Sequence, residues 1–178
     1  MKRIFGTQML FLILLLVVSA CTSNQDFKLY EGRALNIAVI GETPKVIEEH
    51  IEFVEIKFED LFDKDLKVYD AIFIMEENLQ EASQSQYVDV YLHSNIPFFF
   101  IGATKSYHSF VDDELTYEND KELKEISNHY AIGYLSSEQE EDKYWYFGLY
   151  NDEFNERNVK EMYSRIFEAS RSNNPKVN

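Results

Sequence analysis

Three short apolar segments dominate the hydrophobic pattern of the chain. They span residues 34–41 (ALNIAVIG), 69–75 (YDAIFIM) and 96–102 (IPFFFIG). Continuous apolar runs of this length are typical of strands that are buried on both faces of a sheet. The proline in the third segment lies near its start, where a strand tolerates it. The pattern therefore predicts three central strands of one sheet.

The segments between these runs alternate between helical and extended patterns. Residues 44–50 are predicted to form a short helix, because Thr43 is a suitable cap and proline is favoured at the first helical position. Residues 77–94 carry apolar side chains at helical spacing, whereas residues 51–58 alternate and predict a strand nearer the edge of the sheet. Strands that alternate with helices indicate βαβ units, a parallel sheet and helices on both of its faces.

The C-terminal third has a different pattern. Residues 131–135 and 144–150 are short aromatic strands around the acidic loop 136–143, which predicts an antiparallel hairpin. A final amphipathic helix is expected after an Asn155 cap, with its apolar face formed by Val159, Met162, Tyr163, Ile166 and Phe167. We therefore expect a small three-layer α/β domain with a mainly parallel sheet over residues 34–170, followed by a frayed tail at 171–178.

The first twenty residues show the three zones of a secretory signal. Lys2 and Arg3 give a positive start, residues 9–18 (MLFLILLLVV) are apolar, and two small residues follow. The apolar run would form a helix of about 15 Å, which is too short for a hydrocarbon core of about 30 Å. The pattern predicts a signal peptide at residues 1–20 rather than a permanent transmembrane helix.

The segment Val18-Ser19-Ala20-Cys21 resembles the lipobox of bacterial lipoproteins. The resemblance implies cleavage after Ala20 and a diacylglyceryl thioether on Cys21, with fatty acids such as palmitate. It also implies a protein held at the extracytoplasmic face of the cell membrane by this lipid, since two or more acyl chains anchor stably. The polar residues 21–33 are expected to be a flexible, lipid-anchored tether.

Composition excludes several classes of function. Cys21 is the only cysteine, which rules out an intramolecular disulfide, a cysteine-based zinc site and a redox pair. Without residues 1–20 the chain has 15 Lys and Arg against 32 Asp and Glu, a formal net charge of −17. Such a surface repels nucleic acid and anionic lipid headgroups. We expect no nucleic-acid partner and a domain that stands off the membrane.

Residues 34–106 resemble, in their pattern of strands and helices, the core of class I glutamine-amidotransferase-like and flavodoxin-like domains. In the amidotransferases a nucleophilic cysteine follows the strand that corresponds to residues 97–102. This chain has Gly102-Ala103-Thr104 there, so the resemblance implies that the amidotransferase activity is absent. The loop after the first strand lacks Gly-x-Gly-x-x-Gly, and Glu42 would repel a phosphate, so we expect neither a nucleotide nor a cofactor.

Ligands of open parallel sheets bind beyond the carboxyl ends of the strands. The candidates in these loops are the carboxylates of Glu42 and Glu77 and the hydroxyl of Ser106, next to Lys105. Carboxylates at these positions can equally stabilise the N-terminus of a following helix, and a serine can equally belong to an ordinary loop. No metal site is expected, because the histidines lack ligand spacing: His50, His93, His108 and His129.

Two functional hypotheses remain open. The first is a non-catalytic envelope lipoprotein that binds an envelope protein or a glycan, for which the rings around Trp145 are candidates, although they also suit a core. The alternative is a hydrolase-like enzyme with a strand-end site of Glu42, Glu77 and Ser106. A solute-binding lipoprotein of a transporter is disfavoured, because two lobes around a cleft rarely fit in a chain of this length.

Overall fold

The computed structural model describes residues 27–120, 128–137 and 140–173. The strands are β1 (Leu35–Ile40), β2 (Ile51–Glu55), β3 (Ala71–Ile74), β4 (Phe98–Ile101), β5 (His129–Leu135) and β6 (Lys143–Gly148). The helices are α2 (Asp60–Asp63), α3 (Leu79–Ala82), α4 (Ser85–His93), α5 (His108–Val111) and α6 (Glu156–Asn173). Single 3-10 turns are η1 (Leu66–Val68), η2 (Glu76–Asn78) and η3 (Tyr150–Asp152). The predicted signal peptide, Cys21 and residues 174–178 lie outside the described residues.

The six strands form one sheet in the order β2-β1-β3-β4-β5-β6. β2, β1, β3 and β4 are parallel, and Ala38 pairs with Val54 on one side and Ile72 on the other. β5 and β6 are added antiparallel, as the hairpin at the end of the sheet. The predicted fold class is confirmed, and β2 lies at the edge as its alternating pattern predicted.

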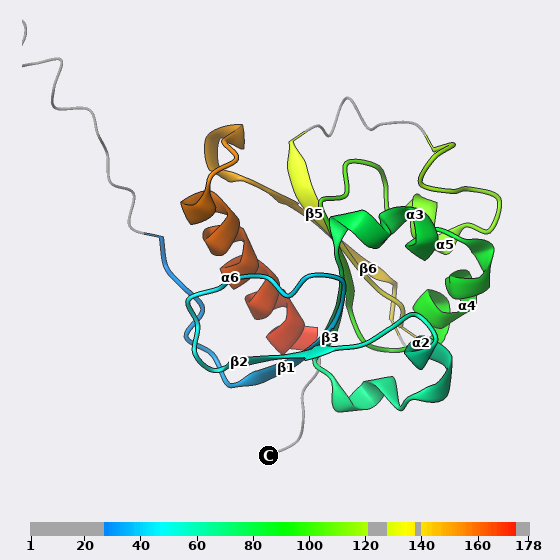
Figure 1. Cartoon of the computed structure of the whole chain (residues 1–178), viewed down its shortest axis with the longest axis horizontal. Helices are drawn as coiled ribbons and strands as arrows, with labels where there is room; N and C mark the ends of the chain where they lie inside the picture. The colour runs from blue at the N-terminus through cyan, green and yellow to red at the C-terminus, as the bar shows by residue number, and fades with distance from the viewer. Residues whose placement is uncertain (1–26, 121–127, 138–139, 174–178) are drawn as a thin grey trace, which may run out of the picture.

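Helices cover both faces of the sheet and make three layers (Figure 1). α6 packs on one face with the side chains of Ile37, Phe73 and Phe99. α3, α4 and α5 pack on the opposite face, over side chains such as Ile72 and Phe100. Both faces of the central strands are therefore apolar, which explains why their sequences show no alternation.

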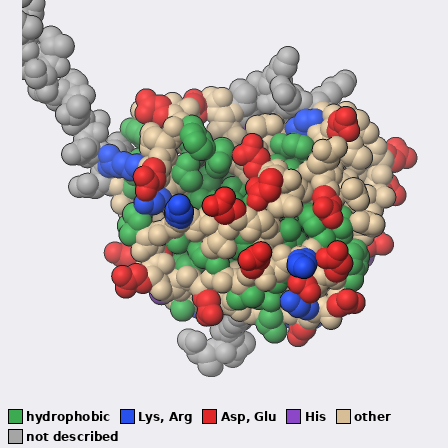
Figure 2. Space-filling model, in the orientation of Figure 1, with side chains coloured by type: hydrophobic (Ala, Val, Ile, Leu, Met, Phe, Trp, Pro, Cys, Tyr) green, Lys and Arg blue, Asp and Glu red, His purple; other side chains and the backbone are tan. Residues whose placement is uncertain are grey.

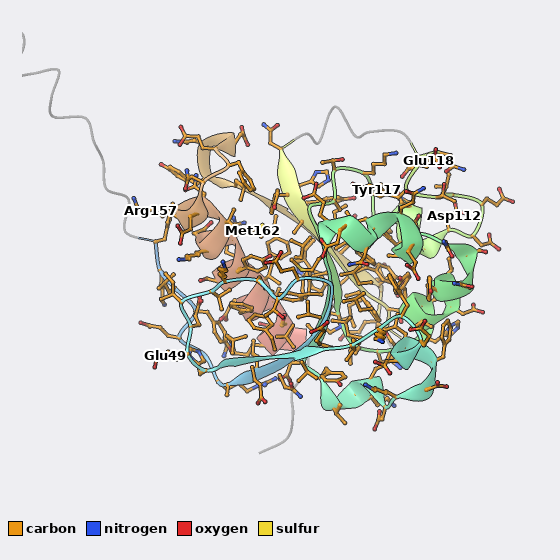
Figure 3. All side chains as sticks on the ribbon, in the orientation of Figure 1. Glu49, Asp112, Tyr117, Glu118, Arg157 and Met162 are labelled. Carbon is orange, nitrogen blue, oxygen red and sulfur yellow. The ribbon has the colours of Figure 1, made fainter. Side chains whose placement is uncertain are left out.

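The final helix follows its predicted pattern closely. The backbone N–H of Asn158 donates to Oδ1 of Asn155 at 2.9 Å, which is the expected cap. Met162 and Phe167 are fully buried, and Figure 3 shows Met162 directed toward the sheet. The ring of Phe167 stacks on Phe73 of β3 with 6.2 Å between centroids. This contact fixes α6 over the middle of the sheet.

Two helix predictions are wrong in detail. Residues 44–50 are irregular, because the buried Glu48 carboxylate accepts the N–H of Ile47 at 3.1 Å and the hydroxyl of Ser164 on α6. The predicted helix 77–94 is divided into η2, α3 and α4. The break is at Ser83, whose hydroxyl donates to the Gln80 carbonyl and accepts the N–H of Tyr117. In both segments a side-chain hydrogen bond replaces a helical one.

The packed domain begins before residue 34. Residues 27–33, which belong to the predicted tether, lie against the domain. Tyr30 is 4 % exposed and stacks on His50 with 5.4 Å between centroids. Arg33 forms an ion pair with the buried Asp70 carboxylate at 2.9 Å. Of the predicted tether, only residues 21–26 lie outside the described residues.

Across the described ranges, no helix is long and apolar enough to cross a membrane.

Candidate functional site

The strand order creates a switch point between β1 and β3. From β1 the chain continues to β2 on one side, and it then returns to β3 on the other side. Crossovers that diverge from neighbouring strands leave a crevice between the loops at their carboxyl ends. Here these loops are residues 41–43 after β1 and 75–78 after β3.

A cavity of about 440 Å³ lies at these loops. We call it the strand-end pocket. Its walls come from the loops after β1 and β3, the end of β4, the start of β5 and the first turns of α6. It is lined by Glu42, Thr43, Pro44, Lys45, Met75, Glu76, Glu77, Ile101, Tyr130, Phe154, Glu156, Val159, Lys160 and Tyr163. The pocket therefore combines segments that lie up to about 120 residues apart in the sequence.

The predicted pair Glu42 and Glu77 is brought together at this pocket. Oε1 of Glu77 accepts the backbone N–H of Glu42 at 2.9 Å, and Nδ2 of Asn78 donates to the Ile40 carbonyl at 3.3 Å. Between them, Gly41 has φ +115° and lies against the Glu77 side chain, so a residue with a Cβ would be both strained and crowded. The Glu77 carboxylate thus holds the β1 loop in place.

Two phenols line the pocket. Burial raises the pKa of Tyr130, and the nearby Glu76 carboxylate raises it further. Burial also raises the pKa of Tyr163, with smaller contributions from Tyr130 and Glu77. Both side chains therefore stay protonated at neutral pH and offer hydroxyl groups rather than negative charge. Tyr130 also packs on the exposed ring of Phe154 with 5.4 Å between centroids.

The charges of the pocket are unequal. Nζ of Lys160 lies 2.6 Å from Oε1 of Glu156 on α6, and this hydrogen bond lowers the pKa of Glu156. These two charges offset each other. Glu42, Glu76 and Glu77 then contribute three negative charges against the single positive charge of Lys45. The arrangement favours a cation over an anion.

Ser106 does not join Glu42 and Glu77. It is 6 % exposed and is not part of the pocket lining. Its Oγ lies 2.7 Å from Nδ1 of His108 and accepts the N–H of that residue at 3.3 Å, a local arrangement at the start of α5. Lys105 points elsewhere, since its Nζ donates to the carbonyls of Tyr117 and Glu118. The structure therefore brings Glu42 and Glu77 together at the pocket and places Ser106 outside it.

The turn after β4, at Gly102 and Ala103, is closely packed. Gly102 has φ +79° and lies against the side chain of Glu76, while Ala103 is fully buried. The backbone N–H of the neighbouring Thr104 donates to the Tyr117 hydroxyl at 2.9 Å, and the Thr104 hydroxyl lies 3.3 Å from the same oxygen. This turn supports the loop that follows it.

The remaining candidates lie apart from the pocket. Trp145 is half-buried and packs on Phe99 with 5.9 Å between centroids, as a core ring would. Within the part of the chain that the structure describes, no three His, Cys, Asp or Glu side chains are placed to hold a metal ion. Asp142 accepts the Tyr134 hydroxyl at 2.7 Å and the Ser137 N–H at 3.0 Å, so it organises the hairpin loop.

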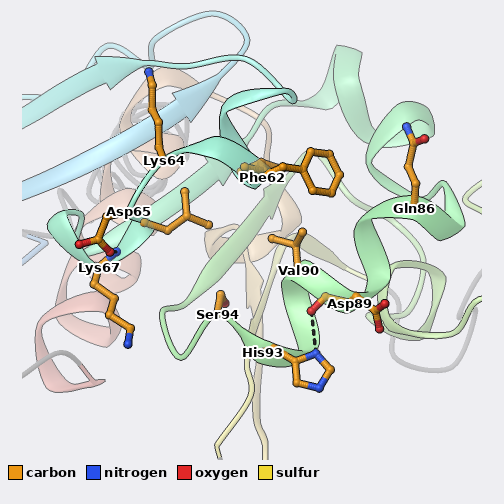
Figure 4. A pocket seen from close by; sticks show the side chains of 11 residues that line it. Phe62, Lys64, Asp65, Lys67, Gln86, Asp89, Val90, His93 and Ser94 are labelled. Carbon is orange, nitrogen blue, oxygen red and sulfur yellow. Dashed lines mark hydrogen bonds between the residues drawn. The ribbon is translucent and has the colours of Figure 1, made fainter.

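A larger groove of about 700 Å³ lies between the α2–η1 segment and α4 (Figure 4). Its lining includes the exposed ring of Phe62 and both signs of charge. Nδ1 of His93 lies within hydrogen-bond distance of the Asp89 carbonyl oxygen, at 2.8 Å, and both residues belong to α4. The groove is lined by residues that precede β3 and β4, so it lies away from the carboxyl ends of the strands, where ligands of open parallel sheets bind. We therefore take the smaller strand-end pocket as the candidate site.

Sequence reasoning missed the C-terminal half of this pocket. The apolar spacing places Tyr163 on the core face of the last helix, and no motif singles out Tyr130, Phe154 or Lys160. Tyr163 is indeed 3 % exposed, but its position at the pocket is set by where α6 crosses the sheet. No local pattern signals that position.

Comparison of this chain with protein-family models, with curated proteins and with solved structures gives no match, so the pocket geometry and the sequence motifs are the basis for its function.

Proposed function

We propose that this chain is a lipid-anchored protein of the cell envelope that binds a small, positively charged ligand in the strand-end pocket without transforming it. The observation that carries the binding proposal is the cavity of about 440 Å³ at the switch point between β1 and β3. Its volume is within the range of small-molecule sites, about 300–1,000 Å³. Apolar side chains such as Met75 and Ile101 line it together with a few polar groups.

The sign of the ligand charge follows from the lining. When the ion pair of Glu156 and Lys160 is left out of the count, the lining of the pocket holds three carboxylates and one cation. Tyr130 and Tyr163 add hydroxyl groups that can accept a hydrogen bond from an ammonium group. An amine with a small apolar body matches both the carboxylates and the apolar lining. An anion of the same size would meet net repulsion.

The geometry supports binding rather than hydrolysis. A hydrolase of the alternative type needs a nucleophile and a base at the same cavity. Ser106 is 6 % exposed and does not line the cavity, so its hydroxyl is not placed beside Glu42 and Glu77. The Glu77 carboxylate is engaged with the backbone N–H of Glu42.

The anchor proposal depends on the lipobox-like segment ending at Cys21. It is tested by labelling cells with a radioactive fatty acid and comparing the wild-type chain with Cys21→Ser. We expect label on the wild type alone, in the membrane fraction. Equal label on both chains, or a full-length wild-type chain in the cytosol, refutes the anchor.

The binding proposal is tested with two probes of matched size and opposite charge. Phenethylamine and phenylacetate are titrated separately into the purified protein and followed by calorimetry. We expect measurable binding of the amine only. Glu76→Gln should weaken it about threefold to tenfold, since it removes one rim charge, whereas Glu52→Gln on the exposed edge of β2 should not. Equal binding of both probes, or equal effects of both variants, contradicts the proposal.

A further inference from the structure

A second cavity adjoins the strand-end pocket at the first turn of α6. It has a volume of about 610 Å³, and its apolar side chains are Phe27, Leu29 and Ile47. Asn155, Glu156, Arg157 and Lys160, at the start of α6, complete the lining, and we call these seven residues the anchor-side groove. The Ile47 side chain is 53 % exposed, although a large aliphatic residue gains little from contact with water. Ile47, with the half-buried Phe27 and Leu29 beside it, gives this side of the domain a small apolar surface that can contact another phase or molecule.

The groove lies where the described chain begins. The Arg157 guanidinium lies over the Phe27 ring, 4.8 Å from its centroid, and Figure 3 shows Arg157 beside the N-terminal segment. The edge of Phe27 also contacts the Tyr150 ring, with 5.4 Å between centroids. Phe27 is thus held on the domain surface, and the chain toward Cys21 leaves from this side.

The distance to the anchor is short. Because residues 27–33 pack on the domain, only residues 21–26 separate the sulfur of Cys21 from the groove. Six extended residues span at most about 22 Å, and six flexible residues have an r.m.s. reach of about 13 Å. A lipid on Cys21 therefore keeps this side of the domain close to the bilayer.

The chemistry of the groove suits a lipid surface. Figure 2 shows Lys and Arg side chains on one side of the domain, with apolar and acidic side chains next to them. Apolar side chains insert at the boundary between headgroups and acyl chains, and a cation beside them, here Arg157 over Phe27, contacts phosphates. Because Lys160 pairs with Glu156, Arg157 leaves the groove with one net positive charge, whereas the chain after residue 20 carries −17. Anionic headgroups therefore repel this side of the domain less than the acidic remainder.

We propose that the anchor-side groove rests on the lipid bilayer when Cys21 is lipidated, so that the domain has a fixed orientation. The inference rests on the proposed anchor and does not depend on the ligand. It replaces the expectation of a domain that stands off the membrane. Because the strand-end pocket shares Glu156 and Lys160 with this cavity, its ligand enters next to the membrane surface.

The test uses the full lipidated chain in vesicles of phosphatidylethanolamine and phosphatidylglycerol. Since Cys21 is the only cysteine and its sulfur carries the lipid, a new cysteine can be labelled alone with a bimane fluorophore. Ile47→Cys places the fluorophore in the groove. Val68→Cys on η1 is the matched control, because that aliphatic side chain is 51 % exposed and lies in a different part of the domain (Figure 1).

Nitroxide-bearing lipids are then added to the vesicles, and quenching is compared between the two sites. We expect quenching at position 47 to be at least threefold stronger than at position 68. Equal quenching in chains that float with the vesicles overturns the orientation and leaves the anchor intact. Chains that do not float with the vesicles refute the anchor, and the orientation with it.

Discussion

Oε1 of Glu77 accepts the backbone N–H of Glu42 at 2.9 Å, and this bond joins two loops whose residues are 35 positions apart. The bond connects the ends of β1 and β3, the two strands that flank the switch point. It gives Glu77 a positioning role at the pocket and leaves the Glu42 side chain at the rim.

Replacing Glu77 should loosen the pocket. Glu77→Ala removes a charge-assisted hydrogen bond at a partly solvated site, and we expect a loss of about 1 kcal/mol in the free energy of unfolding. Urea denaturation measures this change. Glu77→Gln keeps an acceptor oxygen and should recover most of it. Glu42→Ala is the control, because its contribution to the bond is a backbone N–H; a loss as large as that of Glu77→Ala would contradict this role.

Gly133 of β5 should not tolerate a side chain. A Cβ there would lie 2.6 Å from Cε1 of Phe99 and 2.8 Å from Cε3 of Trp145, well inside normal contact. Gly133→Ala is therefore expected to lower the thermal midpoint, with a cost of about 1–3 kcal/mol for an overpacked core. Calorimetry measures it. Combining the change with Trp145→Leu should restore part of the loss, and an unchanged midpoint in the single variant would refute the close approach.

The contact between α6 and the sheet should dominate stability. Phe167→Ala removes a fully buried ring stacked on Phe73, and such truncations cost about 3–5 kcal/mol. Phe62→Ala is the matched control, since that ring is 56 % exposed and should cost less than about 1 kcal/mol. Chemical denaturation of both variants gives the comparison. Similar losses for the two would be inconsistent with α6 as the main cover of its face.

Buried tyrosines should make the fold sensitive to alkali. Burial raises the pKa of Tyr91 and Tyr163, whereas the unfolded chain releases these protons near the ordinary value of about 10. The folded state then holds more protons than the unfolded state, so this contribution to stability is complete below about pH 10 and is lost as the pH rises toward the folded pKa. Urea unfolding followed at increasing pH, with tyrosinate absorbance, measures the decline.

Tyr91→Phe provides the comparison for this pH dependence. The Tyr91 hydroxyl donates to the Ala82 carbonyl at 2.9 Å, so its removal costs some stability at neutral pH. It should also make the decline above about pH 10 less steep, because one titrating group is gone. An identical slope in variant and wild type would show that Tyr91 does not contribute to it.

The buried central strands and the last helix could be predicted from local patterns, whereas the order of the strands in the sheet comes from the tertiary structure. Residues 34–41, 69–75 and 96–102 are apolar without alternation because helices cover both faces of β1, β3 and β4. The Asn155 cap and the spacing of the apolar residues of α6 also depend only on residues that are close together in the sequence. The helix expected at 44–50 failed, because the carboxylate of Glu48 bonds to Ser164, a residue more than a hundred positions away.

The sequence by itself determined the α/β class, the hairpin and the final helix, since alternation, capping and apolar runs are properties of neighbouring residues. It also predicts the signal peptide and the lipid on Cys21, which remain predictions. Only the tertiary structure decided that residues 27–33 pack on the domain and that Tyr130 and Tyr163 meet Glu76 and Glu77 at one pocket. Such contacts depend on where α6 and β5 cross the sheet, and that geometry arises from packing among distant segments rather than from any local pattern.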